Sequence, residues 1–128
     1  MELTFYKCEH CGNFLIPVID SGVTPVCCGS PMEKLQANTT DAAVEKHVPV
    51  IEREADGKHV CVSVGEAPHP MADDHYIEFV VIVRDDRFGV INLKPGDEPK
   101  VCCAFDDISG PVIAYAYCNL HGIWKAEA

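Results

Sequence analysis

Residues 76–84 read Tyr-Ile-Glu-Phe-Val-Val-Ile-Val-Arg, a run rich in β-branched and aromatic side chains. Successive side chains alternate across a strand, so positions 77, 79, 81 and 83 would share one face. Further β-rich runs occupy residues 58–64, 88–93, 100–105 and 112–118, with Gly- and Pro-containing turns between them. No window of helical length shows a 3.6-residue period. The pattern predicts a mostly β domain, an immunoglobulin-like antiparallel β-sandwich.

The chain divides near residues 36–41. Residues 1–36 are rich in Cys, Gly and Pro, and so short a segment usually depends on a metal or disulfides to fold. Residues 37–41 read as a polar linker, with Asp41 capping one helical turn through Val44. We therefore expect a metal-stapled module over residues 1–36 and a β-sandwich domain over residues 37–128.

Composition excludes several classes of protein. The chain has 128 residues and a formal net charge of −10, which makes it a poor partner for nucleic acid. No apolar run approaches the ~20 residues that a membrane span needs. The N-terminus carries an early Glu2 and no apolar stretch typical of a signal peptide. We expect a cytoplasmic protein without nucleic-acid or membrane partners.

The 8 cysteines fit either disulfides or metal sites. Disulfides are rare in a reducing cytosol, and the adjacent pairs Cys27-Cys28 and Cys102-Cys103 do not bridge internally without strain. We favour metal binding over a disulfide framework. Cys61, Cys102 and Cys103 lie in β-rich runs, and we expect them to be buried free thiols.

The N-terminal cysteines form a pattern typical of a tetrahedral metal site. Cys8-x2-Cys11 is a metal knuckle, and Cys27-Cys28 supplies a second pair of thiols without a spacer. Four thiolates on a small scaffold suit zinc or iron, and the metal would supply much of the folding energy. A zinc staple without a redox role is the alternative.

A second set of candidate ligands lies in the predicted sandwich. His47, His69, His75 and His121 fall in loops or at strand ends, and Cys118 ends the last long β-rich run. Ligands at such positions suit a site built at one edge of a sandwich. Four imidazoles and a thiolate exceed what tetrahedral zinc needs but suit five-coordinate iron with one open position. Blue copper is disfavoured, because no Met follows His121.

Taken in order, these motifs resemble the desulfoferrodoxin family, the two-iron superoxide reductases. The matching segments cover almost the whole chain: Cys8-x2-Cys11 with Cys27-Cys28, Glu45-Lys46-His47-Val48-Pro49, His69-Pro70-Met71 with His75-Tyr76-Ile77, and Cys118-Asn119-Leu120-His121-Gly122-Ile123-Trp124. The resemblance implies two irons per chain. Cys8, Cys11, Cys27 and Cys28 would hold one. His47, His69, His75 and His121 would be equatorial ligands of the other, with Cys118 axial.

The resemblance also implies an activity: one-electron reduction of superoxide to hydrogen peroxide without release of oxygen. Lys46 is the candidate for attracting superoxide against the negative net charge, because distant exposed charges are screened. Glu45 matches the family carboxylate that closes onto the iron after turnover. A rubredoxin-like electron donor and a homodimer are further implications.

Two other functional classes stay open on the sequence. The chain fits a pure electron-transfer protein carrying two irons, or a zinc-stabilised binding module whose histidines have no shared role. An open coordination position with Lys46 beside it favours the enzyme over both.

Overall fold

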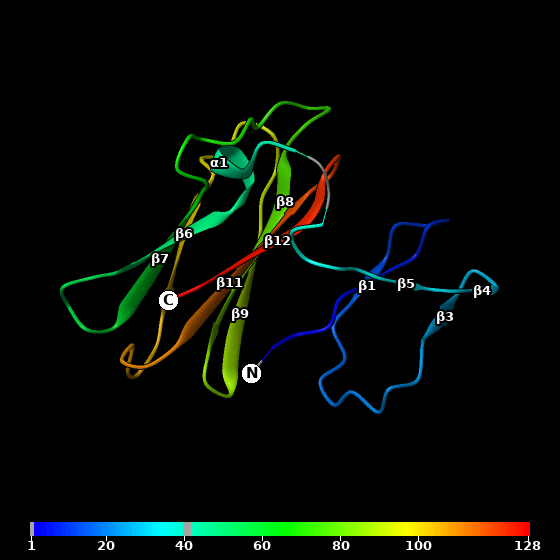
Figure 1. The fold of residues 1–128 in the computed structure, drawn as a ribbon, viewed down its shortest axis with the longest axis horizontal. Coiled ribbons are helices and arrows are strands. Elements are labelled where there is room, and N and C mark those ends of the chain that lie inside the picture. Colours follow the sequence, from blue (N-terminus) through cyan, green and yellow to red (C-terminus); the bar gives the residue numbers. More distant parts are fainter. Residues whose placement is uncertain (1, 40–41) are drawn as a thin grey trace. The chain divides into compact units, whose positions relative to one another are not determined.

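The computed structural model describes residues 2–39 and 42–128. The chain forms two compact units, Glu2–Gln36 and Ala37–Ala128 (Figure 1). The predicted cap Asp41 lies outside the described residues. Within these residues, no helix has the length and apolar character needed to cross a membrane.

The first unit consists of short strands. β1 (Tyr6–Lys7) pairs antiparallel with both β2 (Phe14–Leu15) and β5 (Glu33–Lys34), and β3 (Val26–Cys27) pairs with β4 (Ser30–Pro31). The buried cluster is small: Tyr6, Cys8 and Met32, with Cys27 packed against it. Such a core is too small to stabilise a fold on its own, as expected for a module that depends on its thiol cluster.

The second unit is a sandwich of two antiparallel sheets, and the predicted fold class is confirmed. One sheet has the order β10-β7-β6, and the other has the order β12-β11-β8-β9. The strand bounds are β6 (Pro49–Arg53), β7 (His59–Val64), β8 (Ile77–Arg84), β9 (Arg87–Asn92), β10 (Lys100–Ala104), β11 (Val112–Cys118) and β12 (Gly122–Glu127). Side chains from both sheets, including Val60, Val62, Val80, Ile82 and Ala114, form the core between them.

A short helix lies at one end of the sandwich. The helix α1 (Val44–His47) begins after Ala43, whose side chain makes no capping hydrogen bond. The predicted helical turn ended at Val44, and the observed helix starts at that residue. Gly65 follows β7 and packs against this turn: a Cβ there would lie 2.8 Å from the carbonyl oxygen of Glu45. The amide of Ala67 donates to the same oxygen at 2.9 Å. These contacts fix α1 against the end of β7.

The linker residue Asn38 runs along the free edge of β12. Its backbone amide donates to the carbonyl of Ile123 at 3.0 Å. Its side-chain Nδ2 donates to the carbonyl of Lys125 at 3.1 Å, and its Oδ1 accepts from the amide of Lys125 at 2.7 Å. One linker residue therefore pairs with the outward-facing backbone groups of two β12 residues.

One sequence prediction is wrong. Cys61 and Cys102 are not free thiols: they form a disulfide between β7 and β10, with their Cα atoms 4.1 Å apart. The two residues lie directly opposite each other in the antiparallel register. Strand pairing brings them together across a sequence separation of 41 residues, which the sequence pattern alone did not reveal. Cys103 is a free, half-buried thiol.

Candidate metal centres

Five predicted ligands lie at one end of the sandwich. His47 ends α1, His69 and His75 belong to the segment between β7 and β8, Cys118 ends β11, and His121 lies in the turn before β12. Figure 1 shows α1 and the segment between β7 and β8 at the same end. Because the strands are antiparallel, segments far apart in sequence converge there.

The ligand atoms of these residues are close together. One atom each from His47, His75, Cys118 and His121 lies within 4.8 Å of the others. His69 joins them, since its Nε2 is 3.1 Å from Nε2 of His47 and its ring centroid is 4.7 Å from that of His75. Nδ1 of His121 lies 3.1 Å from Nε2 of His47 and 3.7 Å from Sγ of Cys118. Nitrogen and sulfur atoms thus converge on one point.

Backbone carbonyls orient two of the rings. Nδ1 of His47 is 2.6 Å from the carbonyl of Ala43, and Nδ1 of His69 is 2.7 Å from that of Pro70. A proton on each Nδ1 leaves Nε2 free as a metal ligand. Nε2 of His75 is buried without a hydrogen-bond partner in the structure. An unpaired buried nitrogen directed at other ligand atoms fits a metal site.

Burial sets the protonation of these ligands. Burial lowers the pKa of His69 to about 4, and burial also lowers the pKa of His47. Both imidazoles are therefore neutral at pH 7, as metal ligation requires. Burial raises the pKa of the Cys118 thiol, although the amides of Leu120 and His121 act in the opposite direction. A metal that binds Cys118 has to displace its proton.

Two residues that the sequence reasoning did not single out support this cluster. The indole of Trp124 lies over the ring of His47, with centroids 5.0 Å apart, and its Nε1 donates to the carbonyl of His121 at 3.1 Å. The side chain of Asn119 bonds to the segment that carries His75. Both residues lie in the Cys118–Trp124 motif, and this motif is the feature of the sequence from which they could have been identified.

The other predicted thiol cluster forms in the first unit. One sulfur from each of Cys8, Cys11, Cys27 and Cys28 lies within 4.8 Å of the others. The amide of Cys11 points to Sγ of Cys8 at 3.5 Å, as in a metal knuckle. Cys28 has a left-handed φ of 52°, which lets two adjacent cysteines turn their sulfurs to one cluster.

The pKa values of Cys8, Cys27 and Cys28 are shifted in different directions. The amide of Cys11 lowers the pKa of Cys8 to about 6, whereas interaction with Cys11 raises the pKa of Cys27 to about 12. Interaction with Cys11 also raises the pKa of Cys28. A bound cation would stabilise all of them as thiolates, so the cluster suits tetrahedral zinc or iron.

Two family models match adjoining parts of the chain. The model described as desulfoferrodoxin matches residues 39–127, and the desulfoferrodoxin N-terminal domain matches residues 1–35. The chain belongs to the desulfoferrodoxin family.

Relatives and solved structures agree with this assignment. A desulfoferrodoxin of Syntrophotalea carbinolica is 46% identical over 127 residues, covering 98% of this chain and 97% of the relative. A desulfoferrodoxin of Nitratidesulfovibrio vulgaris is 47% identical over 129 residues, covering 99% of this chain and 98% of the relative. The crystal structure of the superoxide reductase from Treponema pallidum aligns with a TM-score of 0.80 and 30% identity, covering 98% of this chain and 97% of that one.

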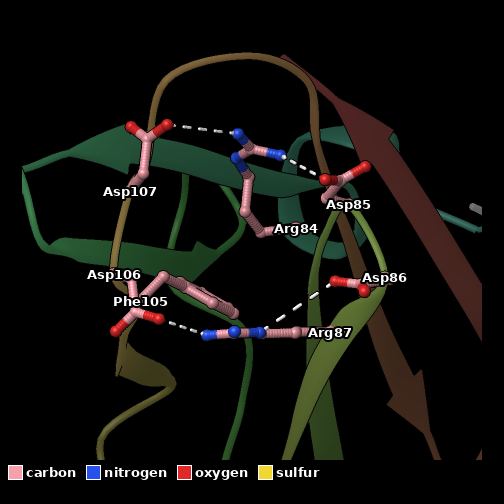
Figure 2. A pocket seen from close by; sticks show the side chains of 7 residues that line it. All are labelled: Arg84, Asp85, Asp86, Arg87, Phe105, Asp106 and Asp107. Carbon is pink, nitrogen blue, oxygen red and sulfur yellow. Dashed lines mark hydrogen bonds and ion pairs between the residues drawn. The ribbon is translucent and has the colours of Figure 1, made fainter.

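A charged pocket lies at the opposite end of the desulfoferrodoxin sandwich (Figure 2). Its volume is about 210 Å³, and its lining consists of Arg84, Asp85, Asp86, Arg87, Phe105, Asp106 and Asp107. The two guanidinium groups pair with the surrounding carboxylates; Arg87 Nη1 lies 2.5 Å from Asp106. Because each of the two guanidinium groups is already paired with two of the four carboxylates, we assign the pocket a structural role.

Proposed function

We propose that the protein reduces superoxide to hydrogen peroxide at an iron bound by His47, His69, His75, His121 and Cys118. The observation that carries this proposal is the convergence of their ligand atoms at one end of the sandwich. The likeness to the superoxide reductase from Treponema pallidum over nearly the full chain supports it.

The donor set fits iron. Imidazole suits iron as well as zinc and copper, and a buried thiolate adds a soft, electron-rich donor. When bound, iron supplies a centre that gains or loses one electron. Burial keeps the imidazoles of His47 and His69 neutral, and the carbonyls of Ala43 and Pro70 orient them. The burial of Cys118 excludes water from that side of the site.

Lys46 and Glu45 would act at the rim of this cluster. Both are exposed on α1, directly before the ligand His47. The ammonium group of Lys46 would raise the local concentration of the superoxide anion and orient the water that supplies protons. Glu45 would bring a carboxylate to the metal after turnover. The contact of Gly65 with the Glu45 carbonyl supports both roles, because it fixes this turn at the site.

The first unit would hold a second iron. We propose that residues 1–36 form a domain of their own whose Cys8, Cys11, Cys27 and Cys28 bind this iron, and that residues 37–128 form the catalytic domain. The four-sulfur cluster supports one-electron exchange with a rubredoxin-like donor. We further propose that the protein works as a homodimer; the strongly exposed Val18 and Ile19 offer apolar surface for association.

The stoichiometry of the reaction tests the proposal. Superoxide, one electron and two protons give one hydrogen peroxide, whereas dismutation yields oxygen and half as much peroxide. Iron-loaded protein with excess reductant is exposed to a superoxide flux while peroxide and oxygen are recorded. We expect one peroxide per superoxide and no oxygen; oxygen evolution, or a chain holding zinc in both clusters, would contradict the proposal.

Cys118→Ser provides the site control. This substitution removes the sulfur donor and should abolish both the activity and the visible thiolate-to-iron absorption, while the absorption of the four-cysteine centre persists. Cys11→Ser is the matched change in the other cluster. We expect it to leave peroxide formation from a chemical reductant intact. The visible band that remains in Cys11→Ser is the one assigned to Cys118, and its survival in Cys118→Ser would exclude Cys118 as a ligand.

A further inference from the structure

The disulfide between Cys61 and Cys102 lies on the outer face of the β10-β7-β6 sheet. Val60, Val62 and Val64 of β7 point into the sandwich core, so the alternate residue Cys61 points outward. On β10, Val101 belongs to the core and Cys102 is exposed. Neither cysteine belongs to a cluster of metal ligands.

The two cysteines differ in their exposure to solvent. β10 is an edge strand of its sheet, and Cys102 on it is exposed, whereas Cys61 on the central strand is only 5% exposed. Thiol–disulfide exchange proceeds by attack of a thiolate on an accessible sulfur. A reagent in solution therefore reaches Cys102 first, and Cys61 is placed to act as its resolving partner.

The surroundings of the pair are polar. Lys100 lies on the same strand face two residues before Cys102, and it is exposed opposite Ser63. On the other side, the exposed Glu52 of β6 lies opposite Cys61. The register neighbours on this face are therefore polar or charged, and a nearby cation favours a reactive thiolate.

Cys103 provides an internal comparison. It is the next residue of β10, it points to the opposite face, and it packs against the core as a free thiol. Burial raises the pKa of Cys103. The fold thus places a reactive arrangement and an inert thiol at adjacent positions of one strand.

We propose that Cys61 and Cys102 form a redox-active dithiol–disulfide couple that hydrogen peroxide oxidises and small thiols reduce. It would be a third redox site, separate from both metal clusters. In a cytoplasmic protein, as the sequence predicts, a disulfide is more often catalytic or redox-sensing than structural. The identity of peroxide as the local oxidant rests on the proposed function.

The chemistry of the couple balances without another reagent. The Cys102 thiolate attacks one peroxide oxygen, the O–O bond breaks, and the departing hydroxide takes up a proton to become water. The first step leaves a sulfenic acid on Cys102. The thiol of Cys61 then loses its proton and attacks the Cys102 sulfur, which forms the disulfide. The hydroxide that leaves the sulfenic acid takes up a proton to become a second water. Two electrons pass from the thiols to peroxide. Two molecules of a small thiol restore the dithiol through a mixed disulfide on Cys102.

The test uses iron-loaded protein in the absence of denaturant. Dithiothreitol reduces the pair, the reagent is removed, and hydrogen peroxide is added directly, so that the result does not depend on superoxide chemistry. Alkylation at timed intervals and peptide mass spectrometry follow each cysteine. We expect the Cys61–Cys102 pair to oxidise at least about tenfold faster than Cys103. Equal rates, or reduction only in denaturant, would show a structural disulfide and overturn the proposal.

Variants assign the order of attack. In Cys61→Ser, a sulfenic-acid trap such as dimedone should label Cys102; label at Cys103 instead, or no label, would contradict the proposal. Cys103→Ser, which leaves the couple intact, should oxidise at the rate of the parent. Cys118→Ser should also retain that rate, and its loss would show that oxidants made at the iron, not direct attack by Cys102, form the disulfide. Far-ultraviolet circular dichroism and the denaturant midpoint of the β-sandwich verify folding in each variant.

Discussion

The amide side chain of Asn119 holds the backbone of Tyr76: its Oδ1 accepts a hydrogen bond from the Tyr76 amide at 2.9 Å. Its Nδ2 donates to the carbonyl of Asp74 at 3.1 Å, and its own backbone amide donates to the Tyr76 carbonyl at 3.2 Å. Asn119 directly follows the proposed ligand Cys118, and the segment it holds carries the proposed ligand His75. One side chain therefore couples the positions of two residues of the candidate metal site.

Replacement of this side chain should loosen the cluster. Asn119→Ala leaves the Tyr76 amide and the Asp74 carbonyl without their partners, and we expect the free energy of unfolding to fall by about 1–3 kcal/mol. Loss of the constraint on His75 should also weaken iron retention. Denaturant unfolding of the iron-loaded protein and the rate of iron transfer to a chelator measure the two effects.

Asn119→Asp is the matched control for this prediction. The carboxylate keeps an acceptor for the Tyr76 amide but replaces the donor to Asp74 with a charged acceptor, so Asn119→Asp should lose stability yet retain iron better than Asn119→Ala. Iron retention in Asn119→Ala equal to that of the parent would show that the hydrogen bonds to Asn119 do not position His75.

Lys46 should govern the encounter with superoxide. In Lys46→Ala the second-order rate should fall about tenfold, and its dependence on ionic strength should weaken, because the positive charge directly before His47 is gone. Stopped-flow or pulse-radiolysis measurements at several salt concentrations give both quantities. The iron content should not change.

Lys58→Ala serves as the control for charge alone. Lys58 is exposed directly before β7, at the opposite end of that strand from the metal-ligand cluster. Its loss changes the net charge equally and should leave the encounter rate within a factor of about two. Equal effects of both variants would indicate that net charge, and not the position of Lys46, sets the rate.

The buried His69 predicts a pH dependence of the metal-free protein. Its pKa of about 4 in the folded chain lies below the ordinary value of 6.5, so the unfolded chain takes up a proton first as the pH falls. The free energy of unfolding that His69 contributes is fully present above pH 6.5 and decreases towards pH 4. Urea unfolding after iron removal should show this decrease, and His69→Gln should make it shallower, whereas His10→Gln at an exposed position should not.

Arg53 should stabilise the sandwich at the end opposite the ligands. Its guanidinium group donates to the carbonyls of Ile108, Gly110 and Ala128 at 3.0, 2.6 and 3.0 Å. Arg53→Lys cannot make all three bonds and should lower the free energy of unfolding by about 1–3 kcal/mol with activity unchanged. Arg87→Lys, which alters an exposed ion pair, should cost less than about 1 kcal/mol. The reverse order would contradict this assignment.

The strands that the sequence revealed are those with strong β character. Residues 77–84 and 112–118 were recognisable because long runs of Val, Ile, Ala and Tyr fit strands buried on both faces. The sequence indicated that a strand starts directly after His47, as β6 does, but not how far β6 extends, and β12 was not predicted as an element. β6 ends in the charged Glu52-Arg53, and β12 directly follows the Cys118–His121 ligand motif, with Ile123 and Trp124 both buried, which hides the two-residue alternation.

The candidate ligands could be identified from the sequence because their residue types and spacing within short motifs are typical of metal sites. Contacts between segments that are distant in the sequence could not be identified in this way. The Cys61–Cys102 disulfide depends on the register between β7 and β10, and the role of Asn119 depends on a loop next to it in space. Gly65 likewise shows its importance only when the backbone of α1 lies against it.

The attachment of Asn38 to Ile123 and Lys125 also bears on association between molecules. β12 lies at the margin of its sheet, where unpaired amides and carbonyls would invite a strand from another molecule. With these groups occupied by the linker, intermolecular sheet extension along Ile123–Lys125 is blocked. A second copy of the chain that adds a strand would have to use another sheet edge, and this margin of the sheet is protected against the strand-to-strand stacking that begins aggregation.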